Sequence, residues 1–76
     1  MNYIDIDSSN LKSVAYDGLT TLGIRFQRGG EYHYTNVPPA VFVGLLSASS
    51  SGSYFHKHIR NNYKCVKVVA VPEEVG

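Results

Sequence analysis

The chain lacks the features on which several common protein classes depend. Cys65 is its single cysteine, which excludes an internal disulfide and a structural zinc site made of several cysteines. The longest uninterrupted apolar run, Ala40–Leu46 with its glycine included, has seven residues, whereas a membrane span needs ~20. Residues 1–15 contain no apolar stretch of the kind that a secretory signal requires. We therefore expect a cytoplasmic protein without a membrane contact.

The length of 76 residues allows one domain and no more. An apolar content of 43% favours a folded globule over a disordered segment. Ordering such a chain costs roughly 1.5 kcal/mol per residue, which leaves little free energy for building a deep active-site cavity. We expect a single domain over residues 1–71 and a short acidic tail over residues 72–76.

Acidic residues are missing from a long segment in the second half of the chain. The net charge is only +1, but residues 36–71 contain no aspartate or glutamate. The four cations of this segment lie within eleven positions: Lys57, Arg60, Lys64 and Lys67. Such a local excess favours the binding of anions, although a charged face can equally serve to keep a small protein in solution.

The pattern over residues 11–34 is typical of β-strands. Apolar residues alternate with polar or small ones from Leu22 to Phe26, and the two tyrosines of Tyr32–Tyr34 flank a histidine in the same way. Asp17–Gly18 and Gly29–Gly30 provide the residues that tight hairpin turns need. The sequence therefore predicts an antiparallel three-stranded meander with one apolar face. We expect both tyrosines to pack on this face, and stacking on the bases of a nucleic acid is the alternative for them.

Two short helices are predicted after the meander. The range Pro39–Ser49 begins with a proline, which suits a first helical turn, and continues with apolar residues at helical spacing. Ser50–Ser53 interrupts this pattern and offers N-caps for a second helix, on which Phe55, Ile59 and Tyr63 form one inward-facing stripe. The apolar residues of the first helix are Val41, Phe42, Leu45, Leu46 and Ala48.

A last strand is predicted over Cys65–Val71, where β-branched residues dominate. It either completes the sheet or pairs with another chain, and the second alternative makes a homo-oligomer through Val66–Val71. The apolar faces of the sheet and the helices can cover each other. The expected fold class is therefore α+β: an antiparallel three-stranded β-meander followed by two short helices packed on one face and, in the first alternative, an extra C-terminal strand.

A series of short motifs runs in a fixed order over residues 4–64, nearly the whole chain. It consists of Ser8–Ser9, Tyr16–Asp17, Tyr32–Tyr34, Val37–Pro38, Val41, Phe42, Leu45, Ser51–Phe55, Ile59–Arg60 and Tyr63. This series resembles the KTSC domain family, and the order of the motifs makes chance a poor explanation. Ala15, Phe42 and His56 depart from the residues usual in the family, and His56 lies in the segment best placed to touch a ligand.

The resemblance implies a small domain that occurs at the carboxyl terminus of some lysyl-tRNA synthetases and as stand-alone proteins of bacteria and phages. It also implies RNA binding, a role suspected from the companion synthetase, and it brings no catalytic residue with it. A fold does not define a function, so the function has to be argued from a site.

The start of the second helix is the predicted ligand site. A helix start presents unpaired N–H groups and a partial positive charge, and glycine lets a phosphate approach the backbone. Tyr54 is the candidate for stacking on a base, because its neighbour Phe55 heads the inward stripe. The alternative interpretation is an ordinary capped turn between two helices. The candidate ligand-binding residues are Ser51, Gly52, Ser53, Tyr54, His56, Lys57 and Arg60.

Catalytic and metal sites find little support in the sequence. His56 and His58 are two positions apart on a helix, so they point to nearly opposite sides and cannot share a metal ion. A dyad of Cys65 and His58 stays open as an alternative, although a lone cysteine beside valines is usually a packing residue. No general acid and general base pair at a suitable spacing. We expect no enzymatic activity, no metal and no cofactor.

These observations predict a non-enzymatic binding module for a phosphate-bearing ligand, either RNA or a nucleotide, cyclic nucleotides included. RNA binding would show a steep dependence on salt concentration, whereas a nucleotide pocket would show a shallow one. The alternative function is that of a small oligomeric inhibitor of the phage type in the host cytoplasm, which sequesters a host nucleotide immune signal or binds a host protein.

Overall fold

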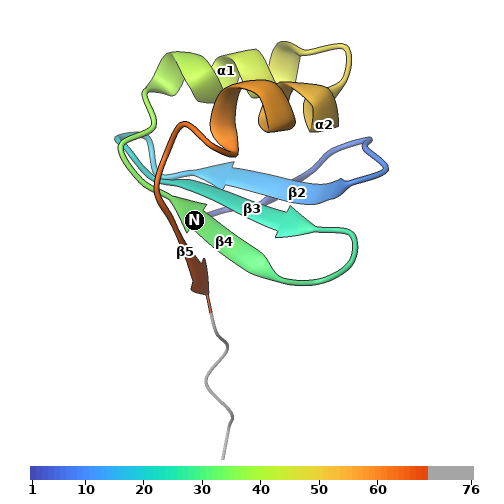
Figure 1. Cartoon of the computed structure of the whole chain (residues 1–76), viewed down its shortest axis with the longest axis horizontal. Coiled ribbons are helices and arrows are strands. Elements are labelled where there is room, and N and C mark those ends of the chain that lie inside the picture. The colour runs from blue at the N-terminus through green and yellow to red at the C-terminus, as the bar shows by residue number, and fades with distance from the viewer. Residues whose placement is uncertain (69–76) are drawn as a thin grey trace, which may run out of the picture.

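The computed structural model describes residues 1–68, which form a five-stranded antiparallel sheet with helices on one face (Figure 1). Neighbouring strands follow the order of the chain. The strands are β1 (Ile4–Asp5), β2 (Leu11–Tyr16), β3 (Leu22–Phe26), β4 (Glu31–Tyr34) and β5 (Cys65–Val68). The helices are α1 (Pro39–Ser47), α2 (Ser51–Tyr54) and the π-helical turn η1 (Phe55–Ile59). The backbone is helical throughout residues 51–59, so α2 and η1 run on as one helix, here called the second helix.

The predicted α+β architecture is confirmed, and the meander has the predicted order of strands β2, β3 and β4. Of the two alternatives for the last strand, Cys65–Val68 completes the sheet, where Cys65 pairs with Tyr34 of β4. Residues 69–71 of the predicted strand and the predicted acidic tail over residues 72–76 lie outside the described residues. Strand β1 was not predicted, and it extends the sheet on the side opposite to β5.

The two hairpin turns form where the sequence places them. Gly18, Gly29 and Gly30 have φ angles of 87°, 101° and 94°, which L side chains rarely adopt. The carboxylate of Asp17 accepts hydrogen bonds from the backbone N–H groups of Leu19, Thr20 and Thr21 and so closes the first turn. These local interactions fix the register of the strands.

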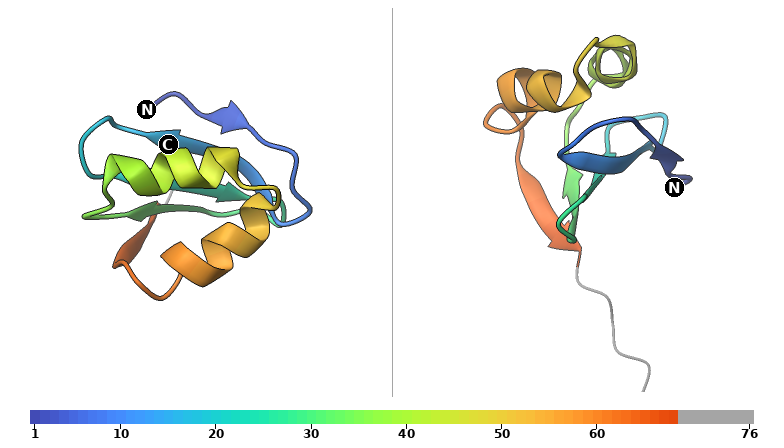
Figure 2. Two further views of the ribbon diagram at one scale, coloured as in Figure 1. Left: turned by 90° about the horizontal axis from the view of Figure 1, so that it is seen from above. Right: turned by 90° about the vertical axis from the view of Figure 1, so that its right-hand side faces the viewer.

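The core lies between the sheet and the two helices, which cover the same face (Figure 2). The sheet contributes residues such as Ile24, α1 contributes Leu45, and the second helix contributes Phe55 and Ile59. The apolar stripe predicted for α1 is narrower than expected, because Leu46 is 42% exposed. The buried core residues are Leu11, Val14, Leu22, Ile24, Tyr34, Val37, Leu45, Phe55 and Ile59.

The second helix ends in a wider turn than its sequence suggests. The backbone N–H of Arg60 donates to the carbonyl of Phe55 at 2.9 Å, five residues earlier, which is the π-helical pattern. Phe55 and Ile59 are both buried, as the predicted stripe requires. Tyr63 follows after the helix has ended and packs against the core from the connecting turn. Single π-turns are frequent at functional sites.

The face of the sheet away from the helices is partly covered as well. The segment that leads into β1 crosses this face and places the side chain of Tyr3 over Gly23, where any Cβ atom would collide with the phenol. Ser13 and Ala15 of β2 are buried, although they do not belong to the helix-facing core. The prediction of one apolar face is therefore incomplete: small residues on the second face make room for an aromatic side chain.

Candidate functional site

Two hollows adjoin the second helix. The smaller one, about 410 Å³, lies between residues 7–10 and the start of the helix at residues 49–53. The larger one, about 730 Å³, lies between the helix and the β3–β4 hairpin. Asn10 and His56 line both, so the two hollows adjoin at these residues.

The smaller hollow contains the predicted phosphate cradle, but its polar groups are largely occupied. The side chain of Ser50 accepts a hydrogen bond from the backbone N–H of Ser53 at 3.2 Å, which makes it the N-cap. The hydroxyl of Ser51 donates to the carbonyl of Leu45 at 3.2 Å. Asp7 also lines this hollow and adds a negative charge that disfavours an anion. The local geometry is that of a capped turn between two helices.

The larger hollow has an aromatic floor, and we call it the aromatic groove. Phe26 of β3 lies at the centre, with its ring edge-on to Tyr32 and to Phe55 at centroid distances of 5.7 and 5.5 Å. Phe55 is in turn edge-on to Tyr34 at 5.5 Å. Phe26 and Tyr32 are only half-buried, so parts of their surfaces face solvent. The groove is lined by Asn10, Phe26, Arg28, Gly29, Tyr32, Tyr34, Phe55, His56, Arg60, Asn61 and Cys65.

Basic side chains surround this floor, and none of the described residues that line the groove is an aspartate or a glutamate. Arg28 reaches it from the β3–β4 turn, and Arg60 from the end of the second helix. The Nη1 atom of Arg60 lies 3.3 Å from each of the two ring nitrogens of His56, so the guanidinium lies directly against the imidazole. Lys67 pairs with Tyr32 in the sheet and therefore lies on the same face.

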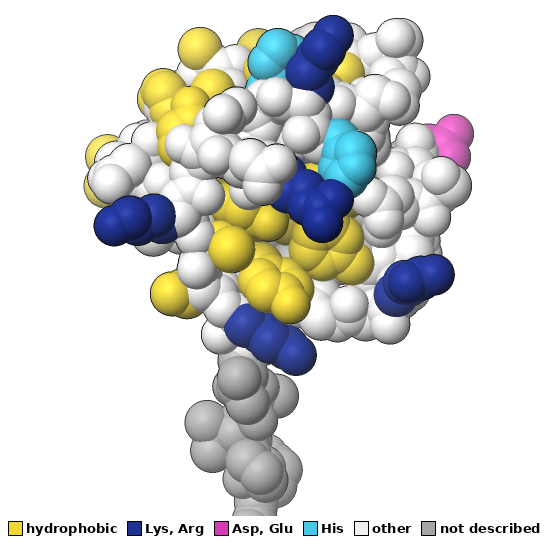
Figure 3. All heavy atoms as spheres, in the orientation of Figure 1, with side chains coloured by type: hydrophobic (Ala, Val, Ile, Leu, Met, Phe, Trp, Pro, Cys, Tyr) yellow, Lys and Arg dark blue, Asp and Glu magenta, His cyan; other side chains and the backbone are white. Residues whose placement is uncertain are grey.

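Figure 3 shows the resulting surface. Hydrophobic side chains form the bottom of the hollow beneath the second helix, with lysine or arginine and histidine side chains around it. Acidic side chains appear on this face only at its margin. The combination of exposed aromatic surface and surrounding positive charge suits a ligand that has both flat rings and anionic groups.

The predicted site residues divide into three groups. Ser51, Gly52 and Ser53 line the smaller hollow, while His56 and Arg60 line the aromatic groove. The other two predicted residues, Tyr54 and Lys57, line neither of these hollows, because their side chains point to other sides of the second helix.

Tyr54 faces α1 instead of solvent. Its phenol ring packs onto Gly44 of α1, where an added Cβ atom would collide with it. The ring of His58 lies against it with 4.5 Å between centroids. Lys57 is exposed on the outer side of the second helix. His58 and Cys65 do not form the dyad that was considered for them, because His58 packs against Tyr54 whereas Cys65 lines the groove.

Phe26, Arg28 and Tyr32 of the groove are not among the predicted site residues. Tyr32 was expected to pack on the core, which it does in part. Arg28 directly precedes the glycine pair of the β3–β4 turn. It therefore lies outside residues 36–71, the acid-free segment from which the cationic site was predicted. Its place in the same groove as Arg60 follows from the approach of the hairpin to the second helix, which the order of charges along the chain does not reveal.

Tyr34 and Cys65 lie opposite each other at the β5 end of the groove. Tyr34 is 4% exposed, and its burial raises the pKa of its hydroxyl to about 12, with a further contribution from the facing thiol of Cys65. The guanidinium of Arg60 acts in the opposite direction on the same pKa. The hydroxyl therefore stays protonated and is a hydrogen-bond donor throughout the neutral range.

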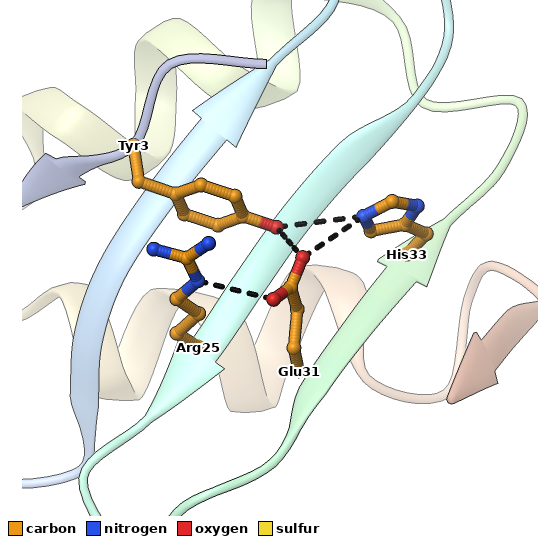
Figure 4. A network of polar contacts seen from close by, with 4 residues as sticks. All are labelled: Tyr3, Arg25, Glu31 and His33. Atoms are coloured by element: carbon orange, nitrogen blue, oxygen red, sulfur yellow. Dashed lines mark hydrogen bonds and ion pairs between the residues drawn. The ribbon is translucent and has the colours of Figure 1, made fainter. Parts of the chain in front are cut away.

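A second cluster of polar side chains lies on the opposite face of the sheet (Figure 4). The hydroxyl of Tyr3 donates to Glu31 Oε2 at 2.7 Å, and His33 Nε2 lies 3.3 Å from the same oxygen. Arg25 donates to Glu31 Oε1 at 3.1 Å, and its guanidinium lies 3.7 Å from the centre of the Tyr3 ring. The hydrogen bond from Tyr3 is the main cause that lowers the pKa of Glu31. This cluster attaches the amino-terminal segment to the sheet.

Within residues 1–68, no three histidine, cysteine, aspartate or glutamate side chains come together as ligands for one metal ion. None of the helices formed by these residues has the length and apolar character needed to cross a membrane.

Similarity to known proteins covers most of the chain. Lysine–tRNA ligases of Nostoc punctiforme and Trichormus variabilis are 39% identical to it over 59 residues, which are 76% of this chain and 10% of each ligase. The chain thus spans only about a tenth of the ligases that it matches. A protein of Tsukamurella paurometabola is 34% identical over 62 residues, which are 80% of this chain and 92% of that protein.

The fold has a solved counterpart. The crystal structure of a KTSC domain protein from Yersinia pestis matches with a TM-score of 0.86 and 30% sequence identity, and covers 90% of this chain and 97% of that one. The family model for the KTSC domain matches residues 7–63. The chain therefore belongs to the KTSC domain family.

Proposed function

We propose that the chain is a non-enzymatic binding module for single-stranded RNA and that the RNA lies in the aromatic groove. The observation that carries this proposal is the combination of a half-exposed aromatic floor with Arg28 and Arg60 in a groove to which residues 1–68 contribute no carboxylate. The proposed site therefore lies closer to the β3–β4 hairpin than the site predicted from the sequence, which was the start of the second helix.

The floor offers surface for unstacked bases. Phe26 and Tyr32 stand edge-on to each other, so each presents a separate surface to the groove. Proteins that bind single-stranded nucleic acid use such aromatic side chains as stacking platforms, and each stacked base contributes about 1–3 kcal/mol. Single strands are the natural partners, because bases in a duplex are already stacked.

The cations fit the phosphates of the same ligand. Arg28 and Arg60 come from two different elements and line the same groove, so a strand lying along the floor meets a guanidinium from each. Guanidinium groups bind phosphate oxygens through two parallel hydrogen bonds. Lys67 and His56 add further positive groups on this face. The names of the relatives agree with this ligand class, since lysine–tRNA ligases act on an RNA.

Binding of a labelled single-stranded RNA of about ten nucleotides, followed by fluorescence anisotropy, tests this proposal. Arg60→Gln removes a cation of the groove, and Lys57→Gln removes a cation of the same helix outside the groove. We expect Arg60→Gln to weaken binding about tenfold and to reduce the slope of log affinity against log salt by about one. Lys57→Gln is the matched control, and its affinity should stay within about twofold of the unmodified protein.

Equal effects of the two substitutions would contradict binding in the groove. Mononucleotides and cyclic nucleotides serve as competitors in the same assay. If one of them displaces the RNA at a one-to-one ratio and itself binds with little salt dependence, the ligand is a nucleotide and the proposal for RNA fails.

Self-association is a second candidate function, favoured by the position of β5 in the sheet. In the sheet formed by residues 1–68, β5 is an edge strand, and its Val66 side chain is 60% exposed. The outer edge of such a strand can pair with the same edge of a second copy. Light scattering of the full chain tests this: we expect a dimer that Val66→Lys converts to a monomer. A monomer for the unmodified chain over the whole accessible concentration range would contradict self-association.

A further inference from the structure

The hydroxyl of Tyr34 is a buried polar group without an adequate partner. Tyr34 is 4% exposed, yet among residues 1–68 its hydroxyl makes no hydrogen bond to an oxygen or nitrogen atom. The group that faces it is the thiol of Cys65, and a hydrogen bond between the hydroxyl and a sulfur atom is weak. Buried hydroxyls normally have a partner, and each exception calls for an explanation.

Tyr16 provides a contrast within the same sheet. Its hydroxyl lies 2.6 Å from the carbonyl oxygen of Val37 and 2.8 Å from that of Leu19. The fold therefore satisfies one tyrosine hydroxyl with the backbone and leaves the other directed into a groove. This difference points to a ligand at Tyr34.

The surroundings of Tyr34 define the kind of ligand group. Arg60, Asn61 and Cys65 line the same groove as Tyr34, and the positive charge of the Arg60 guanidinium acts to lower the pKa of the Tyr34 hydroxyl. A neutral phenol donor and a guanidinium together suit an anionic oxygen acceptor. Within the part of the chain that the structure describes, no acidic side chain lines this groove to compete for them.

We propose that the Tyr34 hydroxyl and the Arg60 guanidinium together bind one phosphate oxygen of the RNA at the β5 end of the aromatic groove. This inference rests on the proposed function and adds to it the residue that fixes the position of the backbone. A bound phosphate gives the buried hydroxyl a much stronger hydrogen-bond acceptor than the thiol of Cys65. It also covers the thiol of Cys65, which lies opposite Tyr34.

Tyr34→Phe is the first test, because it removes the hydroxyl and keeps the ring against Phe55. Because the variant loses only a weak contact with the Cys65 thiol, it should unfold at nearly the same urea concentration as the unmodified protein or at a higher one. Its affinity for the RNA should fall about tenfold, as expected for a hydrogen bond to a charged group. Tyr16→Phe is the matched control with the reverse pattern: lower stability and unchanged affinity.

Alkylation of Cys65 by N-ethylmaleimide is the second test, and the chain has no other cysteine. Saturating RNA should slow the reaction several-fold in the unmodified protein. Unchanged affinity of Tyr34→Phe, or alkylation that RNA does not slow, would overturn this assignment and leave RNA binding elsewhere in the groove intact. Failure of the unmodified protein to bind the RNA would overturn the assignment and the proposed function together.

Discussion

The ring of Phe26 in β3 meets the ring of Phe55 in the second helix edge-on, with 5.5 Å between their centroids. Phe55 is buried, whereas Phe26 is half-buried and lines the groove. The same contact therefore joins the hairpin to the helix and forms the floor of the groove. Because this floor is continuous with the core, we expect the groove to be present before a ligand binds.

Substitution of Tyr32 tests the stacking surface. Tyr32→Leu keeps an apolar side chain but removes the ring, so the affinity for single-stranded RNA should fall between about fivefold and about a hundredfold. Tyr32→Phe keeps the ring and should bind within about twofold of the unmodified protein. Both are measured by fluorescence anisotropy after circular dichroism has established that the variants are folded. Equal affinities of the two variants would show that the ring is not a stacking platform.

Gly44→Ala tests the contact between α1 and the second helix. Alanine in a helix is favoured over glycine by about 1 kcal/mol, but the new methyl group collides with the Tyr54 ring. Overpacking costs about 1–3 kcal/mol, so we expect a net loss of about 1 kcal/mol in the free energy of unfolding measured with urea.

Gly52→Ala is the matched control for this substitution. Gly52 also lies in a helix, but its added Cβ atom would meet Ser8 Oγ only at an ordinary contact distance of 3.4 Å. We expect unchanged or slightly greater stability for this variant. A loss equal to that of Gly44→Ala would mean that the collision with Tyr54 is not the cause.

The cluster around Glu31 predicts a loss of stability in acid. The pKa of Glu31 is lowered from its ordinary value, first by the hydrogen bond from Tyr3 and then by Arg25 and His33. A lowered pKa in the folded state contributes stability that is present above the unfolded-state pKa and is lost as the pH falls through the folded-state pKa. Glu31→Gln should therefore flatten the dependence of the urea midpoint on pH between about pH 5 and about pH 3.

Tyr3→Phe serves as the second variant in this experiment, because it removes the largest cause of the shift and keeps the carboxylate. Its pH dependence should lie between those of the unmodified protein and Glu31→Gln. If both variants kept the full acid dependence, the stabilising role of the Tyr3–Glu31 hydrogen bond would be contradicted.

Much of the fold could be predicted because its signals are local. Glycines with positive φ mark the two hairpin turns, Pro39 begins α1, and Ser50 caps the second helix. β1 was missed because two strand residues give little periodic signal. The packing of Tyr3 on Gly23 could not be recognised either, since it joins residues that are twenty positions apart.

The candidate site was predictable only in part, for a physical reason. His56 and Arg60 lie in the cationic stretch that the sequence reveals, and both line the groove. Tyr54 was expected to face a ligand because Phe55 faces the core, but the side chain fills the space above Gly44 of α1. Arg28 joins the groove through the packing of the hairpin against the helix, a long-range contact that no local pattern encodes.

The location of the RNA is the point on which the proposed function depends, and NMR of the ¹⁵N-labelled protein tests it most directly. A single-stranded RNA of about ten nucleotides is added to the labelled chain, and the shifts of the backbone amide signals are followed. We expect the largest shifts around the aromatic groove, at Arg28, Tyr32 and Arg60. Shifts that instead gather around Tyr3 and His33 on the opposite face, or no shifts at a stoichiometric amount of RNA, would contradict RNA binding in the groove.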